Sequence, residues 1–244
     1  EVENSRLLAV ASKDKNKLNL FKKKYNFENK YLFNNYDELI NCKDVDIIYI
    51  ALPNFLHHKW AVKCIQNNKN ILLEKPATLN LSEINDIKKK LESKNLFFGE
   101  AFMYRYNPQI KSVINLIENN KIGKPLSMRS YFGNNVWFKR KLFFFKKKKK
   151  IDKNNRLFNK DFGGGCILDL GCYPSSFSLL IGLLSNKTNI NNIRLFNIKN
   201  KIGETKVDID ARAELLFENG FKSKIRASFE KNLGEKSIIK GSKG

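Results

Sequence analysis

The sequence predicts an α/β protein in two parts: a doubly wound parallel sheet, then an α+β part with an open, mostly antiparallel sheet. Two observations predict this order. Short apolar runs alternate with amphipathic segments up to residue 101, and longer strand-like runs follow. Such alternation is typical of parallel strands joined by right-handed helical crossovers. We place the boundary after residue 102, which gives the parts 1–102 and 103–244.

The first part is expected to contain four buried strands with helices between them. A short apolar run bounded by turn residues predicts a strand, and apolar residues three or four positions apart predict a helix face. Ser82 is a favourable N-cap for the last helix, because its hydroxyl accepts an unpaired backbone N–H. Strands are expected at 6–12, 45–52, 70–74 and 96–101, and helices at 15–26, 37–41, 55–67 and 82–91.

The second part is expected to begin with an amphipathic helix at 108–120 and a strand at 126–132. The run KRKLFFFKKKKK (139–150) predicts a solvated loop, and a helix is expected to end near residue 184. Asn219-Gly220 separates two long strand-like runs, and this dipeptide supplies the positive φ angles of a type I′ turn. A β-hairpin is therefore expected near the end of the chain.

Composition narrows the class of protein. The chain has 244 residues, of which 42% are hydrophobic and 19 are Phe, which excludes wholesale disorder. No run approaches the roughly 18 uncharged apolar residues of a membrane span, and no secretory signal is recognisable at residues 1–4. The four cysteines are irregularly spaced without a CxxC pair, and there are two histidines. We therefore expect free thiols in the cytoplasm and no metal site.

The formal net charge of +22 raises the question of a polyanionic partner. The excess is mostly lysine spread along the chain, together with abundant Asn, Ile and Phe, a joint bias that an AT-rich coding sequence produces. Nucleic-acid readers more often concentrate arginine and aromatic residues on one element, and that pattern is missing from the sequence. We therefore expect neither a nucleic-acid nor a membrane partner, and keep a basic nucleic-acid-binding protein as an alternative.

Two segments suited to chemistry follow predicted strands. They are ALPNFLHH (51–58) and Glu74-Lys75-Pro76, at the edge where doubly wound sheets bind ligands. A partly desolvated lysine beside a cationic nicotinamide has its neutral form favoured, which suits proton transfer or a hydrogen bond to a substrate oxygen. The plainer alternatives are an ordinary loop for the first segment, and a solvated lysine before a helix-starting proline for the second.

The third segment is GGGCILDLGCY (163–173). Three glycines allow close backbone approach or a tight entry into a helix. Asp169 and Tyr173 are four positions apart, so a helix places them on one face. A phenol near a cationic lysine can act as an acid towards a ketone or a base towards an alcohol. A packing tyrosine and a helix-start carboxylate are the alternatives, and a P-loop is excluded because no Lys-Ser/Thr follows the glycines.

The order of these motifs resembles the Gfo/Idh/MocA oxidoreductase family, in its glucose–fructose oxidoreductase and dihydrodiol dehydrogenase-like branch. Besides the Pro-Asn and Glu-Lys-Pro strand ends, GEAFMYRYNPQ (99–109), IGKP (122–125) and GGGCILDLGCYP (163–174) carry the resemblance. It implies an N-terminal Rossmann domain for NAD or NADP and a C-terminal domain for substrate binding and oligomerisation. The implied reaction is hydride transfer between the cofactor and a hydroxyl or ketone carbon of a sugar, nucleotide sugar, inositol or dihydrodiol, by a homodimer or homotetramer.

The resemblance also implies roles for individual residues. Lys75 matches the active-site lysine, Tyr173 the proton donor and acceptor, and Asp169 a substrate contact. These roles require Lys75 and Tyr173 to converge beside the nicotinamide. Cofactor contacts are expected from Ser12, Lys13, Pro53, Asn54, His57, Glu74, Lys75 and Arg105.

The strand end at Ser12-Lys13 bears on the choice of cofactor. An acidic residue there binds the ribose 2′-hydroxyl of NAD, whereas a hydroxyl and a cation suit the 2′-phosphate of NADP. NADP is therefore preferred, and Asp14, one position later, keeps NAD open.

The family's Rossmann domain starts with a strand and a GxGxxG-type turn that holds the pyrophosphate. All 13 glycines of this chain lie at or after Gly99, and 6–12 matches the family's second strand. We therefore expect a chain truncated at both ends, which lacks the first strand and the glycine-rich loop. A catalytically inactive fragment, or a sugar- or partner-binding relative, is the corresponding alternative.

Overall fold

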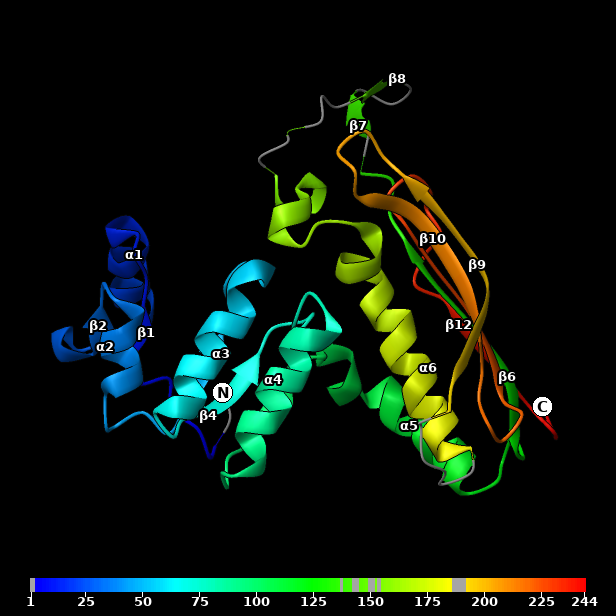
Figure 1. The fold of residues 1–244 in the computed structure, drawn as a ribbon, viewed down its shortest axis with the longest axis horizontal. Helices are drawn as coiled ribbons and strands as arrows, with labels where there is room; N and C mark the ends of the chain where they lie inside the picture. Colours follow the sequence, from blue (N-terminus) through cyan, green and yellow to red (C-terminus); the bar gives the residue numbers. More distant parts are fainter. Residues whose placement is uncertain (1–2, 137, 142–144, 149–151, 153–154, 186–191) are drawn as a thin grey trace. The chain divides into compact units, whose positions relative to one another are not determined.

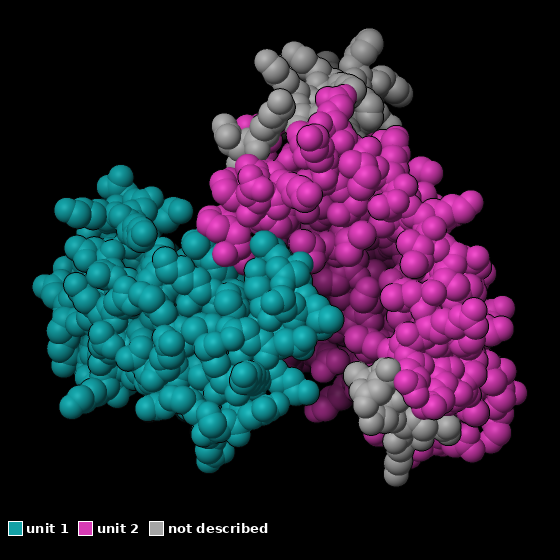
Figure 2. Space-filling view, in the orientation of Figure 1, with its two compact units in different colours: residues 1–52, 56–101 teal, residues 53–55, 102–244 magenta. Residues whose placement is uncertain are grey.

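The computed structural model describes residues 3–136, 138–141, 145–148, 152, 155–185 and 192–244. The chain divides into two compact units, which Figure 2 colours separately. Unit 1 comprises Glu1–Leu52 and Leu56–Ala101, and unit 2 comprises Pro53–Phe55 and Phe102–Gly244.

Unit 1 contains only parallel pairings among its described strands, as the alternating pattern predicted. The strands form two separate sheets, one of two strands in the order β1-β2 and one of three strands in the order β3-β4-β5. The two-residue strand β2 was not predicted. The strands are β1 (Val10–Ala11), β2 (Leu32–Phe33), β3 (Ile47–Ile50), β4 (Asn70–Leu73) and β5 (Phe98–Glu100), and the helices are α1 (Lys15–Tyr25), α2 (Tyr36–Asn41), α3 (His57–Gln66) and α4 (Leu81–Glu92).

The prediction that Ser82 caps the last helix of unit 1 is wrong. The N-cap of α4 is Asn80, whose Oδ1 accepts the Glu83 N–H at 3.0 Å. Glu83 returns the interaction, because its Oε2 accepts the Leu79 N–H at 2.9 Å. The first bond satisfies a backbone donor of the first turn, the second satisfies the N–H of the residue before the N-cap, and the N-cap lies two residues earlier than predicted.

The core of unit 1 lies between the three-stranded sheet and the helices α3 and α4. Ile48 and Ile50 of β3 are buried, whereas Ile47 and Tyr49 between them are 49% and 55% exposed. This alternation differs from the strand buried on both faces that the apolar run predicted. Full burial of an aliphatic side chain stabilises the folded state by about 1.5–3 kcal/mol. The face of β3 that carries Ile48 and Ile50 therefore provides most of what this strand contributes to stability.

Unit 2 is built on a five-stranded sheet with the order β12-β6-β11-β10-β9. Three of its four pairings are antiparallel and the β6–β11 pairing is parallel, so the sheet is mostly antiparallel as predicted. Helix α6 runs along one face of the sheet (Figure 1) and contributes Phe177 and Ile181 to the core. The elements are β6 (Pro125–Gly133), β9 (Arg194–Ile202), β10 (Asp208–Leu216), β11 (Lys222–Ser228), β12 (Ser237–Gly241), α5 (Pro108–Glu118) and α6 (Cys172–Leu184).

The predicted hairpin around Asn219-Gly220 is present, with Leu216 of β10 paired to Lys222 of β11. The predicted type I′ turn is wrong, since Gly220 has φ +84° but Asn219 is not among the residues with positive φ. The side chain of Asn219 instead accepts the Phe221 N–H at 2.9 Å. A side chain that completes the turn removes the need for a second positive φ angle.

The loop predicted at 139–150 is also partly wrong. Strands β7 (Phe138–Lys141) and β8 (Phe145–Lys148) pair as an antiparallel ladder, with Phe138 opposite Lys148. Residues 142–144 and 149–150 of that run lie outside the described residues.

In the described part of the chain, the largely helical stretch Lys160–Leu184 is long and apolar enough to cross a membrane by length and composition, which was not predicted. Only 39% of its most apolar window is buried, but Ile181 and Ser178 of that run are fully buried. The core helix of a soluble protein passes the same test, so this run is weak evidence for a membrane span.

Candidate active site

The carboxyl ends of the parallel strands in unit 1 carry several of the predicted site residues. Ser12 and Lys13 directly follow β1, and Glu74 and Lys75 directly follow β4. Ligands of doubly wound sheets bind at this edge. The Ser12 N–H donates to the Phe33 carbonyl oxygen at 3.0 Å, which extends the β1–β2 ladder by one residue.

The side chain of Asp14 forms hydrogen bonds with the backbone at the start of α1. Its Oδ1 accepts the backbone N–H groups of Asn16 at 2.9 Å and Lys17 at 3.2 Å, so it is the N-cap of α1. The Lys13 ammonium lies 5.9 Å from the centre of the Tyr36 ring. The Lys13 ammonium and the Ser12 hydroxyl therefore belong to adjacent residues, while the Asp14 carboxylate caps α1.

The Glu74–Lys75 segment is held by groups that the sequence analysis did not single out. The Tyr49 hydroxyl of β3 donates to Glu74 Oε1, and the Lys75 N–H donates to Glu74 Oε2 at 3.2 Å. Burial, followed by the hydrogen bond to Glu74, raises the pKa of Tyr49 to about 12. Tyr49 therefore keeps its proton at neutral pH and acts as the donor. The Ala77 N–H donates to Glu100 Oε1 of β5 at 2.8 Å.

His57 is another residue for which the resemblance implies a cofactor contact, and that contact stays a prediction. The side chain is fully buried at the start of α3. Its Nδ1 lies 2.8 Å from the Pro76 carbonyl oxygen and its Nε2 lies 2.7 Å from the Leu52 carbonyl oxygen. Two backbone carbonyl groups thus take both ring nitrogens, and neither nitrogen is presented to a ligand.

In unit 2, a side chain at any of the three consecutive glycines, Gly163–Gly165, would clash with a neighbour or strain the backbone. A Cβ on Gly164 would lie 2.7–2.8 Å from three backbone carbonyl oxygens, and Gly163 has φ +74°. Gly165 has φ +115°, and its Cβ would lie 2.4 Å from Oδ1 of Asp208. The predicted role as a tight entry into the following helix is confirmed.

Asp208, at the first position of β10, is a residue that the sequence analysis missed. Its Oδ2 accepts the Ile167 N–H at 2.6 Å. Ile167 begins a π-helical segment, Ile167–Gly171, which carries Asp169. The carboxylate therefore occupies the N-terminus of the segment that presents Asp169, where the backbone N–H groups and the helix dipole favour a negative charge.

Asp169 is mostly buried, with 14% of its side chain exposed, and its Oδ1 lies 3.2 Å from Nη1 of Arg156. Arg156 belongs to the short 3₁₀ turn Arg156–Phe158, and 55% of its side chain is exposed. Arg156 was not predicted as a site residue, because a turn next to a lysine-rich run carries no motif. The guanidinium neutralises the charge of Asp169 and fixes one of its oxygens.

Tyr173 lies in an aromatic cluster at the start of α6. Its ring centre is 5.5 Å from Phe132, 5.8 Å from Phe102 and 6.2 Å from Tyr104, all in edge-to-face geometry. Contacts of this kind fix the plane of the half-buried ring. They fit both interpretations of Tyr173, as a packing residue and as an oriented acid–base group.

The predicted residues Pro53, Asn54 and Arg105 belong to unit 2. Asn54 is buried, and its Nδ2 donates to the Gly163 carbonyl oxygen at 3.4 Å. Arg105 is exposed in the 3₁₀ turn Met103–Tyr106. The predicted convergence of Lys75 and Tyr173 stays a prediction, since the two residues belong to different units.

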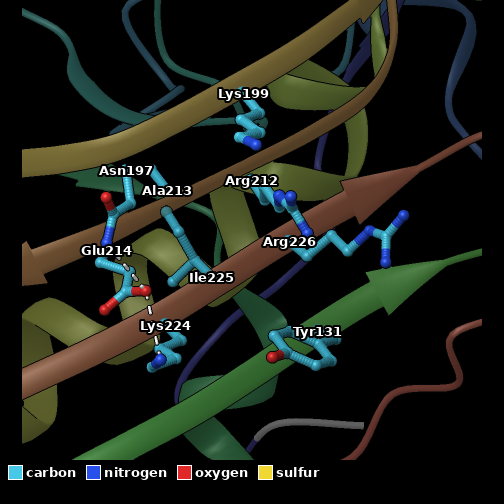
Figure 3. A pocket seen from close by; sticks show the side chains of 9 residues that line it. All are labelled: Tyr131, Asn197, Lys199, Arg212, Ala213, Glu214, Lys224, Ile225 and Arg226. Atoms are coloured by element: carbon cyan, nitrogen blue, oxygen red, sulfur yellow. Dashed lines mark hydrogen bonds and ion pairs between the residues drawn. The ribbon is translucent and has the colours of Figure 1, made fainter.

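A hollow of about 410 Å³ lies on the sheet of unit 2, away from the predicted site residues (Figure 3). Lys224, Ile225 and Arg226 of β11 line it, together with residues of β6, β9 and β10. Glu214 pairs with Lys224 at 3.2 Å within it. We do not assign the chemistry to this hollow, because it contains none of the residues of the glycine-rich motif.

Family models match both parts of the chain. Residues 1–102 match the oxidoreductase family with an NAD-binding Rossmann fold, and residues 110–244 match the GFO/IDH/MocA C-terminal domain. The chain belongs to the Gfo/Idh/MocA family, which confirms the resemblance stated from its motifs.

The curated relatives reported below are 25–29% identical to this chain over the aligned residues. Trans-1,2-dihydrobenzene-1,2-diol dehydrogenase of Xenopus tropicalis is 29% identical over 175 residues, 72% of this chain and 48% of the relative. A dTDP-3,4-didehydro-2,6-dideoxy-alpha-D-glucose 3-reductase of Saccharopolyspora spinosa is 25% identical over 175 residues, with the same coverage. The chain thus spans about half the length of these two relatives.

Solved structures of low sequence identity share the fold. Aldose-aldose oxidoreductase from Caulobacter crescentus, complexed with glycerol, has a TM-score of 0.81 at 19% identity, over 99% of this chain and 68% of that protein. The 3-ketoreductase KijD10 from Actinomadura kijaniata, with NADP and TDP-benzene, has a TM-score of 0.79 at 21% identity, over 99% of this chain and 67% of that protein. The predicted fold class, a Rossmann-like parallel sheet followed by a mixed sheet, is confirmed.

Proposed function

We propose that the protein containing this chain transfers hydride between a nicotinamide cofactor and a hydroxyl or ketone carbon of a sugar-like substrate. The observation that carries the proposal is the anchored Lys75 segment at the carboxyl edge of a parallel sheet, in a chain of this oxidoreductase family. The cofactor would supply the redox chemistry, and the residues of this chain position the substrate and move the proton.

Tyr173 would transfer the proton, and Lys75 would supply the positive charge that orients the reacting groups. In the reductive direction the Tyr173 hydroxyl donates its proton to the substrate oxygen, and in the oxidative direction it accepts that proton. The Lys75 ammonium stabilises negative charge that develops on the phenol or on the substrate oxygen. Asp169, held by Arg156 at 3.2 Å, accepts a hydrogen bond from a neighbouring substrate hydroxyl.

The cofactor we propose is NADP, with NAD as the alternative. The residues after β1 fit a 2′-phosphate, because Lys13 and Ser12 offer a cation and a hydroxyl while the Asp14 carboxylate already accepts two N–H groups of α1. The family resemblance also implies cofactor contacts from Glu74, Lys75, Pro53, Asn54, His57 and Arg105.

The substrate class follows from the relatives. The curated relatives include a dihydrodiol dehydrogenase and a deoxysugar 3-reductase, and the structural neighbours include an aldose-aldose oxidoreductase and a myo-inositol 2-dehydrogenase. We therefore propose a ring compound with adjacent hydroxyl or keto groups, acted on by a cytoplasmic homo-oligomer. Residues 1–102 would serve the cofactor and residues 103–244 the substrate and the subunit contact.

The test is steady-state kinetics on the full-length protein that contains this chain. Lys75→Ala and Tyr173→Phe are expected to lower kcat by about 100-fold or more, the range for general acid–base catalysis, and to leave the NADPH Kd within about threefold. Lys89→Ala and Tyr106→Phe, on exposed positions of α4 and of the turn after β5, are the matched controls. NADPH binding without turnover on any polyol would favour the inactive relative. Salt-sensitive RNA binding with no response to NADPH would contradict the proposal outright.

A further inference from the structure

His57 is the first residue of α3 and its side chain is fully buried, so it has no access to a bound molecule. The two hydrogen-bond distances from its ring, 2.8 Å and 2.7 Å, are both short for a nitrogen–oxygen pair. Both partners are backbone carbonyl oxygens, which only accept, so each hydrogen bond needs an N–H on the ring, and a neutral imidazole carries one such N–H. A buried carbonyl without a donor is costly, which gives this histidine a defined structural task.

The two carbonyl groups belong to the ends of neighbouring strands. Leu52 ends the segment after β3, and Pro76 follows Lys75 after β4. The imidazole therefore joins the two strand ends at the edge where the candidate active site lies.

The carbonyl of Pro76 is a further anchor of the lysine segment. The Glu74 N–H donates to the Ile50 carbonyl oxygen at 3.0 Å before Lys75. Proline has no N–H, so the peptide group between Lys75 and Pro76 offers no donor, and the next peptide group holds the chain after Lys75. That group is held at both ends, because the Pro76 carbonyl oxygen contacts His57 and the Ala77 N–H donates to Glu100.

We infer that His57 is a positioning residue, which fixes the backbone on the carboxyl side of Lys75 and thereby aims the lysine side chain. The inference rests on the proposed function of Lys75 and replaces the expected cofactor contact of His57. Without the ring N–H, the Pro76–Ala77 peptide group keeps its contact with Glu100 but loses the contact of its oxygen, so it can tilt, and the ammonium of Lys75 then samples positions away from the substrate oxygen. Displacements of about 1 Å at a reacting group lower rates by up to about 100-fold.

The first experiment does not depend on activity. Full-length protein labelled with ¹⁵N-histidine is compared by NMR with its His57→Gln variant, and the resonances lost in the variant identify the ring. A ring N–H that is protected from solvent exchange is expected. Ring N–H protons that all exchange freely with water would overturn the inference, whether or not the protein is an enzyme.

The second experiment measures kinetics on His57→Gln and His57→Leu. Glutamine keeps one side-chain N–H donor and leucine keeps none, so kcat is expected to fall about 10-fold in the first and about 100-fold in the second, with the NADPH Kd within threefold of the unmodified protein. A merely structural role would lower thermal stability without this graded loss of kcat in the folded fraction. Unchanged kcat together with weakened NADPH binding would restore the cofactor contact and overturn the inference.

His58→Gln is the matched control. His58 is the next residue, and its ring pairs with Asp86 at the surface at 2.8 Å. Its variant is expected to keep kcat unchanged. If the unmodified protein has no oxidoreductase activity, the proposed function fails while the NMR comparison still decides the placement of His57.

Discussion

The glycine before the π-helical segment offers a quantitative test of the site. In Gly165→Ala the new Cβ would lie 2.4 Å from Oδ1 of Asp208, on a backbone with φ +115°. Strain at such a φ costs on the order of 1–3 kcal/mol for a residue with a Cβ. Asp208 cannot turn away without losing its 2.6 Å hydrogen bond to the Ile167 N–H, which is about another 1.5–3 kcal/mol for a charged acceptor. A destabilisation of about 2.5–6 kcal/mol is expected.

Urea unfolding of the full-length protein, followed by far-UV circular dichroism, measures this cost. Gly220→Ala is the matched control, because Gly220 has φ +84° but nothing lies within 4 Å of its added Cβ, so only backbone strain of about 1 kcal/mol remains. In the double variant Gly165→Ala with Asp208→Ala, the two costs are expected to be less than additive, since the second change removes the clash. A Gly165→Ala cost no larger than that of Gly220→Ala would refute the reasoning.

Three further outcomes are expected. Asn80→Ala should destabilise by about 1 kcal/mol in urea unfolding, as the loss of an N-cap does, while Ser82→Ala should change stability by less than about 0.5 kcal/mol. Burial raises the pKa of Cys64 from 9.0 to about 12, so at pH 8 it carries about a thousandfold less thiolate, and mass spectrometry should find it unlabelled by iodoacetamide under native conditions. Burial alone would raise the pKa of Asp210, but hydrogen bonds from Arg226 and Ser228 outweigh burial and lower it. The stabilisation from this pair is therefore present above the ordinary carboxyl pKa and is lost as the pH falls through the lowered value. Arg226→Met should cost about 2 kcal/mol at pH 7, and equal costs at pH 7 and pH 3 would contradict that sign.

Features set by neighbouring residues could be predicted from the sequence. The strands of unit 1 and the hairpin of unit 2 follow from periodicity and from Asn219-Gly220, because both signals act over a few residues. The choice between Asn80 and Ser82 as N-cap could not be predicted, since both side chains can accept a backbone N–H. Glu83 decides it, because its position three residues after Asn80 completes the reciprocal pair.

The partners of the candidate site residues could not be predicted. Asp208 is 41 residues from Ile167, Tyr49 is 25 residues from Glu74, and Arg156 is 13 residues from Asp169. The residues of each pair come together only in the folded protein, so no local sequence pattern predicts these contacts. Motif order did identify the segments that need partners, and the structure identifies the partners.

The division of unit 1 into a two-stranded and a three-stranded ladder has a consequence for cooperativity. No backbone hydrogen bond of the described ladders joins β1–β2 to β3–β4–β5, so each can lose its protection without breaking the other. The smaller ladder has two residue pairs and is flanked by α1, whose Leu20 and Phe21 are exposed. Deuterium would therefore enter Val10 and Phe33 well before Ile71. Residues 12 and 13 would sit on the part of the unit that opens first, where a bound nucleotide would slow that opening.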